Sequence, residues 1–291
     1  MKIILCPNPF RDKGLKAARN AEQILRGFGI ELSYCLPFQV DREMIGDYDA
    51  EIEIKDMKTE LADADLLICF GGDGTILHAA KDASTFGVPV IGVNMGSVGF
   101  MAELEQDDLS MLTKLPERDY KLENRMLLDV KVIRDGRVLF RSTALNDAVI
   151  TKGAVARVID LEVYGDKTLI SEIFGDGVIV ATPTGSTAYS LSAGGPIVEP
   201  TAENIILTPI SAHTLQAKVM VLDKSRLINV TVPKQSRKTA YLSVDGGKAF
   251  KLFSGDTVEI SKSRRHLSLV KLSNKSFYEI INQKLERRIR S

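Results

Sequence analysis

The chain reads Leu66-Leu67-Ile68-Cys69-Phe70-Gly71-Gly72-Asp73-Gly74-Thr75 at the point that decides its fold, where an apolar run meets a glycine-rich turn. A helix-like run follows at 76–81. The continuously apolar residues predict a strand that is covered on both faces. Without Cβ atoms such a turn lets backbone N–H groups approach a ligand, and the helix N-terminus favours an anion such as phosphate. The stretch therefore predicts a strand, a phosphate-binding turn and a helix.

Strand and helix patterns alternate on both sides of this turn. Apolar runs predict strands at 3–6, 32–35 and 88–93. Apolar residues at helical spacing predict a helix through Ala18, Ala21, Leu25 and Phe28. Such alternation is typical of βαβ units around a parallel, Rossmann-like sheet.

The pattern changes after a charged segment at 115–125. Beyond it, short runs predict strands at 127–133, 138–140, 158–164, 218–222, 227–232, 241–244 and 267–272, with Asp135-Gly136 as a hairpin turn. We therefore expect an α/β domain over residues 1–120 and a mostly-β domain over residues 121–273. A last helix within 274–291 has one apolar face that must pack on another surface, and the first domain offers one.

Composition and charge exclude several classes of protein. Hydrophobic residues make up 44% of the chain and charged residues 26%, which is typical of a globular protein. Lys and Arg number 38, as do Asp and Glu, so no overall field favours nucleic acid or an anionic membrane. Cys6, Cys35 and Cys69 lie too far apart for a disulfide framework or a Cys-x-x-Cys metal site, which favours a reducing cytoplasm.

A carboxylate inside a phosphate-binding turn requires an explanation. Phosphates would repel Asp73 unless it meets a metal or transfers a proton, and a base for an attacking hydroxyl is one such role. Alternatively, Asp73 stabilises the turn or caps the helix. Leu77 stands where a dinucleotide fingerprint needs glycine, and no P-loop sequence occurs, so neither a Rossmann dehydrogenase nor a P-loop NTPase is supported. Lipid kinases and phosphofructokinases use similar turns.

A second polar run is rich in hydroxyl groups and reads Thr182-Pro183-Thr184-Gly185-Ser186-Thr187-Ala188-Tyr189-Ser190. Its proline and glycine favour a turn, and the tyrosine offers an aromatic body with a polar tip. Such a surface suits a nucleoside. The alternative interpretation is a helix start with Ser186 or Thr187 as the N-cap.

Three further segments complete a pattern: Asn94-Met95-Gly96-Ser97-Val98-Gly99-Phe100, Asn146-Asp147 and Gly175-Asp176-Gly177. With the glycine-rich turn and the hydroxyl-rich run, in this order and spacing, they make the chain resemble NAD kinases over essentially its whole length. The resemblance implies an α/β domain and a β-sandwich-like, NAD-binding domain with the site between them. It also implies transfer of the terminal phosphoryl of ATP, or of polyphosphate in some members, to the 2′-hydroxyl of the adenosine ribose of NAD.

The resemblance further implies roles for the first domain's residues. Asp73 would be the general base, and Phe100 would form a wall of the pocket. Gly72, Gly74 and Thr75 would lie against phosphates. A divalent metal, usually Mg²⁺, would be bound mainly through the phosphates of ATP, with no protein ligand expected. The family also implies a homodimer or homotetramer.

In the second domain, the resemblance implies that Asn146 and Asp147 bind the adenosine end of NAD and that Asp176 approaches the nicotinamide half. The NAD site would be lined by Thr187, Ala188 and Tyr189. Two alternatives to an NAD kinase remain at this point. A lipid or diacylglycerol-type kinase shares the turn, and a non-catalytic NAD-binding sensor would be expected to lose its acid.

Four more residues bear on the resemblance. Val98 stands where the family usually has Leu, and His78 stands where Arg is frequent. No basic residue directly precedes Asp176, so these residues offer no cation for charge-based substrate selectivity there. His213 and Asp245 match family positions, but Asp-Gly between two apolar runs is also a hairpin turn.

Overall fold

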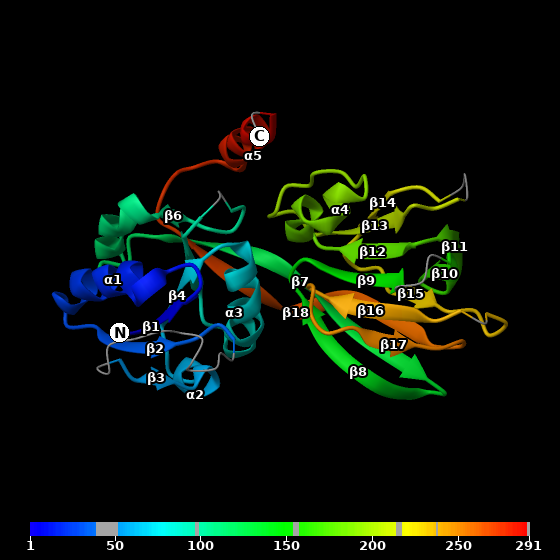
Figure 1. The fold of residues 1–291 in the computed structure, drawn as a ribbon, viewed down its shortest axis with the longest axis horizontal. Coiled ribbons are helices and arrows are strands. Elements are labelled where there is room, and N and C mark those ends of the chain that lie inside the picture. The colour runs from blue at the N-terminus through cyan, green and yellow to red at the C-terminus, as the bar shows by residue number, and fades with distance from the viewer. Residues whose placement is uncertain (39–51, 97–98, 154–156, 214–216, 237, 290–291) are drawn as a thin grey trace. The chain divides into compact units, whose positions relative to one another are not determined.

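The computed structural model describes residues 1–38, 52–96, 99–153, 157–213, 217–236 and 238–289 (Figure 1). Its internal contacts divide the chain into two compact units. Unit 1 consists of Met1–Asn124 and Leu267–Ser291, and unit 2 of Arg125–His266. The divisions fall inside two long strands, β7 (Lys121–Arg134) and β18 (Thr257–Lys271).

Unit 1 is built on a parallel sheet, which confirms the α/β class. Its strands run in the order β3 (Ile54–Lys55), β2 (Glu31–Cys35), β1 (Lys2–Pro7), β4 (Leu66–Gly71) and β5 (Val90–Asn94), and both β6 (Leu104–Glu105) and the end of β18 pair with β5. The helices within the described residues of this unit are η1 (Lys13–Leu15), α1 (Lys16–Arg26), α2 (Met57–Leu61), α3 (Asp73–Phe86), η3 (Gln106–Lys114) and α5 (Phe277–Ile289). Every residue of β4 is buried, as its uninterrupted apolar run predicts.

Helix α1 forms where apolar residues recur at helical spacing. It buries Ala18, Ala21 and Leu25 as predicted. The prediction is wrong for Phe28, which lies beyond the end of α1 and is exposed, because Gly27 already occupies the C-cap. None of the helices within the described ranges has the length and apolar character needed to cross a bilayer.

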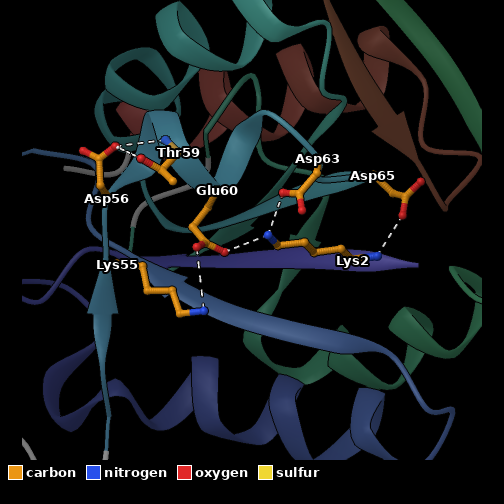
Figure 2. Close-up of polar contacts among 7 residues, drawn as sticks. All are labelled: Lys2, Lys55, Asp56, Thr59, Glu60, Asp63 and Asp65. Atoms are coloured by element: carbon orange, nitrogen blue, oxygen red, sulfur yellow. Dashed lines mark hydrogen bonds and ion pairs between the residues drawn. The ribbon is translucent and has the colours of Figure 1, made fainter.

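An ion-pair cluster ties α2 to the start of β1 in unit 1 (Figure 2). The Lys2 ammonium lies 2.6 Å from Asp63 and 3.0 Å from Glu60, and its backbone N–H donates to Asp65 at 2.7 Å. Lys55 approaches Glu60 from β3 at 3.7 Å. Hydrogen bonding to Lys2 lowers the pKa values of both Glu60 and Asp63. The cluster therefore joins the first strand to α2 and to the segment directly after it, about sixty residues further along the chain.

Unit 2 is a sandwich of antiparallel strands, which confirms the mostly-β class. One sheet has the order β14 (Met220–Asp223), β13 (Asn204–Ile210), β12 (Gly177–Ala181), β9 (Asp147–Lys152), β16 (Ala240–Val244) and β17 (Phe250–Leu252). The other strands are β8 (Arg137–Ala144), paired with β7, and β11 (Thr168–Gly175), β10 (Ile159–Gly165) and β15 (Ile228–Thr231), which lead in that order to β18. Two short helices, η4 (Thr184–Thr187) and α4 (Tyr189–Ser192), follow β12.

The core of unit 2 lies between these two sets of strands. Ile150 and Val180 belong to the first set, and Leu161, Val230 and Ile260 to the second, and all pack in one buried cluster. The predicted hairpin at Asp135-Gly136 is confirmed, since both residues have positive φ between β7 and β8.

Candidate functional site

In unit 1, a hydrogen bond joins the loop that follows β1 to the first turn of α3, which follows β4. The Asn8 amide donates to the Thr75 hydroxyl at 2.9 Å, and a Cβ on Gly71 would lie only 2.2 Å from the same oxygen. Thr75 is therefore buried beneath the turn rather than exposed on it. The chain leaves β1 towards β2 but leaves β4 towards β5, so the strand order reverses between these two strands. Ligands of open α/β sheets bind at such switch points, outside the carboxyl ends of the strands.

The Asp73 carboxylate joins the turn to the loop after β5. It accepts the backbone N–H of Phe100 at 2.8 Å and of Met101 at 3.1 Å. A Cβ on Gly99 would lie 2.2 Å from Asp73 Oδ1, so this close approach requires glycine. The alternative in which Asp73 caps helix α3 is wrong, because the N-cap is Gly72 and the structure has no side-chain cap bond there. The contacts fix the carboxylate's orientation, and each carboxylate oxygen has lone pairs for more than one donor.

The rest of the turn presents backbone to open space. Among the described residues, and apart from the neighbouring residues of the chain and the backbone of α3 itself, no atom lies within 4 Å of the position that a Cβ would take at Gly72 or Gly74. Helix α3 follows directly. The N–H groups of Thr75 and Ile76 donate to the Gly72 carbonyl at 2.9 and 3.3 Å, whereas a helix provides no acceptor of its own for the N–H groups of its first two residues, here Asp73 and Gly74. This geometry suits an anion.

A cationic cavity lies beside the turn, and the sequence interpretation did not single it out. Its volume is about 330 Å³, and its lining includes Arg11, Lys13, Lys16 and Asp107. Met95 also lines it and donates its N–H to the carbonyl of Gly71 at 3.0 Å, so one backbone hydrogen bond links the lining of the cavity to the start of the turn. Within the described residues, none of the three cations forms an ion pair. The sequence did contain a signal for this cavity, which is the group of basic residues directly after the first strand.

Asp12 shapes the floor of this cavity. Its buried carboxylate accepts the N–H groups of Ala17 and Ala18, each at 3.0 Å, and so caps α1. Burial raises the pKa of Asp12, while these backbone bonds oppose that rise. The Asp12 carboxylate is thus engaged by the helix. The other charged side chains that line the cavity are the three cations and Asp107.

In unit 2, the hydroxyl-rich run packs on Asn146. Thr182 donates its N–H to the Asn146 carbonyl at 2.9 Å and its hydroxyl to the Leu145 carbonyl at 2.5 Å. A Cβ on Gly185 would lie 2.1 Å from the backbone carbonyl oxygen of Asn146, so glycine is required there. The structure therefore brings together two of the sequence segments that suggested a nucleoside site.

The next residues connect η4 to α4. Thr187 donates its hydroxyl to the Thr184 carbonyl at 3.2 Å, Ala188 lies between the helices, and Tyr189 is 46% exposed. The predicted N-caps at Ser186 and Thr187 are wrong, because neither hydroxyl bonds the N–H of a following helix residue. The Ser186 hydroxyl bonds the backbone of residue 198, and the Thr187 hydroxyl bonds the preceding Thr184 carbonyl. An exposed tyrosine beside a buried hydroxyl turn can stack on a flat ligand.

Asp176 lies apart from these residues along the same strands. In the β9–β12 ladder Asp147 pairs with Ala181, whereas Thr151 pairs with Gly177 four residues away. At about 3.4 Å per residue, the two ends of the ladder are about 14 Å apart. Asp176 forms a 2.6 Å ion pair with Lys152. A basic partner is therefore present, but it comes from β9 rather than from the residues that precede Asp176.

Asp147 is the buried titratable group of this region. It is 5% exposed, and burial, together with the charge of Asp245, raises its pKa from 3.8 to about 7. Asp245 in turn accepts the N–H groups of Leu145, Asn146 and Asp147. With its pKa raised to near neutral, the Asp147 carboxyl can hold a proton at neutral pH, so it can donate a hydrogen bond as well as accept one.

The two histidines that the sequence singled out are exposed. His78 contacts the Phe38 ring edge-on, with centroids 5.6 Å apart, and His213 contacts Phe174 similarly at 6.0 Å. The His213 backbone N–H also donates to the Phe174 carbonyl at 2.8 Å. Val98 lies outside the described residues.

A family model described as the ATP-NAD kinase N-terminal domain matches residues 19–120, and one described as the ATP-NAD kinase C-terminal domain matches residues 145–272. An NAD kinase of Ruminiclostridium cellulolyticum is 34% identical over 99% of this chain and 98% of its own length. One of Acetivibrio thermocellus is 36% identical over 98% of this chain and 97% of its own.

Solved structures agree. An NAD kinase from Archaeoglobus fulgidus in complex with ATP has a TM-score of 0.72 and 26% identity, and the match covers 97% of this chain and 98% of the other. Yeast NADH kinase complexed with NADH has a TM-score of 0.82 at 24% identity, covering 98% and 86% respectively, which is a likeness of fold.

Proposed function

The chain belongs to the NAD kinase family, and on that basis we propose that it transfers the terminal phosphoryl group of ATP to the 2′-hydroxyl of the adenosine ribose of NAD, which gives NADP. The observation that carries the catalytic part is the pair of backbone bonds that fixes Asp73 within an open phosphate turn. A carboxylate held in this way is pre-positioned to accept a proton.

The donor's phosphates bind to unit 1 in this proposal. The backbone at Gly72 and Gly74 binds the terminal phosphoryl group that is transferred. The cavity lined by Arg11, Lys13 and Lys16 binds the other phosphates of the donor. ATP is the proposed donor because the similar Archaeoglobus enzyme is described in complex with it. A cavity of cations also suits inorganic polyphosphate, which carries the same repeating charge.

The acceptor binds to unit 2 in this proposal. Asn146 and Asp147 take the adenosine end, with Thr187, Ala188 and Tyr189 lining the site beside them. Asp176 lies about 14 Å along the same ladder, on the side that would take the nicotinamide half. The separation suits the two ends of one elongated ligand.

The chemical step is an in-line displacement. The ribose oxygen forms a bond to the terminal phosphorus, the bond from that phosphorus to the bridging oxygen breaks, and ADP leaves. Asp73 takes the hydroxyl proton, and Phe100, whose N–H holds Asp73, forms a wall of the pocket.

A divalent metal such as Mg²⁺ would be held mainly by the donor's phosphates. Within the described ranges no three His, Cys, Asp or Glu side chains come together as a metal site, and Mg²⁺ commonly binds through substrate phosphates. When bound, it would neutralise the charge on those phosphates. We also propose that the protein is a homodimer or homotetramer, which light scattering on the purified protein measures directly.

The test is to incubate the protein with NAD, ATP and Mg²⁺ and to detect NADP with an NADP-specific dehydrogenase. Asp73→Asn should lower turnover by about 10² to 10⁴ while NAD binding stays within a few-fold. Asp82→Asn, on the same helix α3, is the matched control and should keep wild-type turnover. Wild-type turnover in the Asp73 variant would remove this residue from the mechanism, and NAD binding without any NADP would favour a sensor.

A further inference from the structure

The carboxylate of Asp245 gathers three consecutive backbone N–H groups. It accepts from Leu145 at 2.7 Å, from Asn146 at 2.8 Å and from Asp147 at 3.0 Å. The backbone N–H of Asp245 itself donates to the Asp147 carbonyl at 3.0 Å. Four bonds therefore join one residue to the segment that carries Asn146 and Asp147.

The hairpin that contains Asp245 is built to deliver this carboxylate. Asp245 and Gly246 both have positive φ, at 50° and 68°, directly after β16. Gly247 closes the turn by donating its N–H to the Val244 carbonyl at 2.9 Å and by accepting the Ser243 hydroxyl at 2.9 Å. The turn thus closes without using the Asp245 side chain, which is engaged by the neighbouring segment instead.

The same bonds determine what Asn146 can offer to a ligand. Its N–H is engaged by Asp245 and its carbonyl by the N–H of Thr182. The side-chain amide, in contrast, forms no hydrogen bond with any residue that the structure describes. A fixed backbone with an available amide is the arrangement of a residue that is positioned to bind a polar ligand.

We propose that Asp245 is a positioning residue, which holds Asn146 and Asp147 in the geometry that takes the adenosine end of the dinucleotide. This inference rests on the proposed function. Asp245 acts through the backbone of these two residues and needs no contact with the substrate. Its distinguishing feature is that it combines a mechanical role with an electrostatic one.

The electrostatic role concerns the Asp147 carboxyl. On one side β12 presents Ala181 opposite Asp147, and on the other side the turn after β16 presents Asp245. Among the described charged groups, Asp245 is the one whose charge, added to burial, raises the Asp147 pKa to about 7. Removing the charge at residue 245 should therefore lower the pKa of Asp147, whereas a merely structural residue would leave it unchanged.

Asp245→Asn tests both roles. Calorimetry with NAD alone should show binding that is weakened at least tenfold, while turnover at saturating NAD stays within a few-fold. The inflection near pH 7 in the pH dependence of NAD binding should move to lower pH. Asp223→Asn is the matched control, because that carboxylate also accepts a backbone N–H in an exposed turn of unit 2, at 2.8 Å from Ser225, and should change neither quantity.

A folded Asp245→Asn protein with wild-type NAD affinity and an unmoved inflection would overturn the inference. If this variant does not fold, Asp245→Glu keeps the charge on a longer side chain. It should weaken NAD binding while the inflection stays near pH 7, and wild-type affinity in it would equally refute the positioning role. Wild-type protein that binds NAD but forms no NADP would refute the proposed function and leave this inference standing.

Discussion

Replacing Asp147 with Asn should stabilise the protein at pH 8 more than at pH 5. The carboxyl is 5% exposed and lies beside Asp245, so burial and that neighbouring charge raise its pKa from 3.8 to about 7. A pKa difference of about three, at about 1.4 kcal/mol for each pKa unit, makes the ionised form cost about 4 kcal/mol in the folded state.

The direction of the effect follows from proton binding. Because the folded-state pKa is raised, the folded protein holds this proton between about pH 4 and pH 7, where the unfolded chain has lost it. Wild-type stability therefore falls across that window and levels off above it. An Asn at residue 147 has no proton to lose, so its advantage over wild type should widen by about 2 to 3 kcal/mol between pH 5 and pH 8.

Urea unfolding of both proteins, followed by circular dichroism at pH 5 and pH 8, measures the free energy of unfolding in each case. Asp223→Asn serves as the control of opposite sign, because hydrogen bonds from Ser225 lower the pKa of Asp223. That variant should gain no stability at pH 8. An equal gap between wild type and Asp147→Asn at the two pH values would refute the reasoning.

Three other predictions concern unit 1. Gly99→Ala should lower turnover by about tenfold or more while the fold is retained, because the new Cβ would lie 2.2 Å from Asp73 Oδ1 and must displace the proposed base. Steady-state kinetics measures the turnover, and circular dichroism checks that the fold is retained. Replacing Lys13 and Lys16 together with Ala should raise KM for ATP several-fold and leave KM for NAD unchanged, and an equal rise in both would remove the cavity from donor binding. Lys2→Met should lower Tm at pH 7. The effect should begin to fade only below about pH 4, as the pH falls through the lowered pKa values of Glu60 and Asp63, and a gap that does not shrink at all below pH 4 would contradict this origin.

The fold of unit 1 was predictable because its signals are local. The apolar run 66–70 and the glycine turn specify β4 and the start of α3 without information from elsewhere in the chain. Unit 2 was less predictable, and β9, β11, β12, β13 and β17 were not predicted. Residues 177–181 form a short buried strand, but the adjoining hydroxyl-rich run drew the interpretation towards ligand contact.

The catalytic candidate was found, but its supports were not. Asp73 was conspicuous as an acid among glycines. The groups that hold it are the backbone N–H groups of Phe100 and Met101, 27 and 28 residues further along the chain. Every residue other than proline has a backbone N–H, so residue type does not indicate which of them a carboxylate will find. Gly99 is the one residue here whose type reflects this contact. A glycine is needed there because Asp73 approaches closely, and that approach is visible only in the structure.

Asp245 shows why a correct local interpretation can still miss a role. Asp-Gly between two apolar runs does form a hairpin turn here, so the pattern was fully explained without reference to any other part of the chain. The further role arises because β16 pairs with β9, with Val244 opposite Ala148, and this register carries the next residue to the segment that precedes β9. An aspartate at residue 245 suits both roles, that of a turn residue and that of an acceptor of three N–H groups, so the residue type does not distinguish between them. The register of β16 against β9 decides whether the side chain also reaches the segment at 145–147. That register depends on how the chain folds between two segments that are about a hundred residues apart, so a local pattern does not predict it.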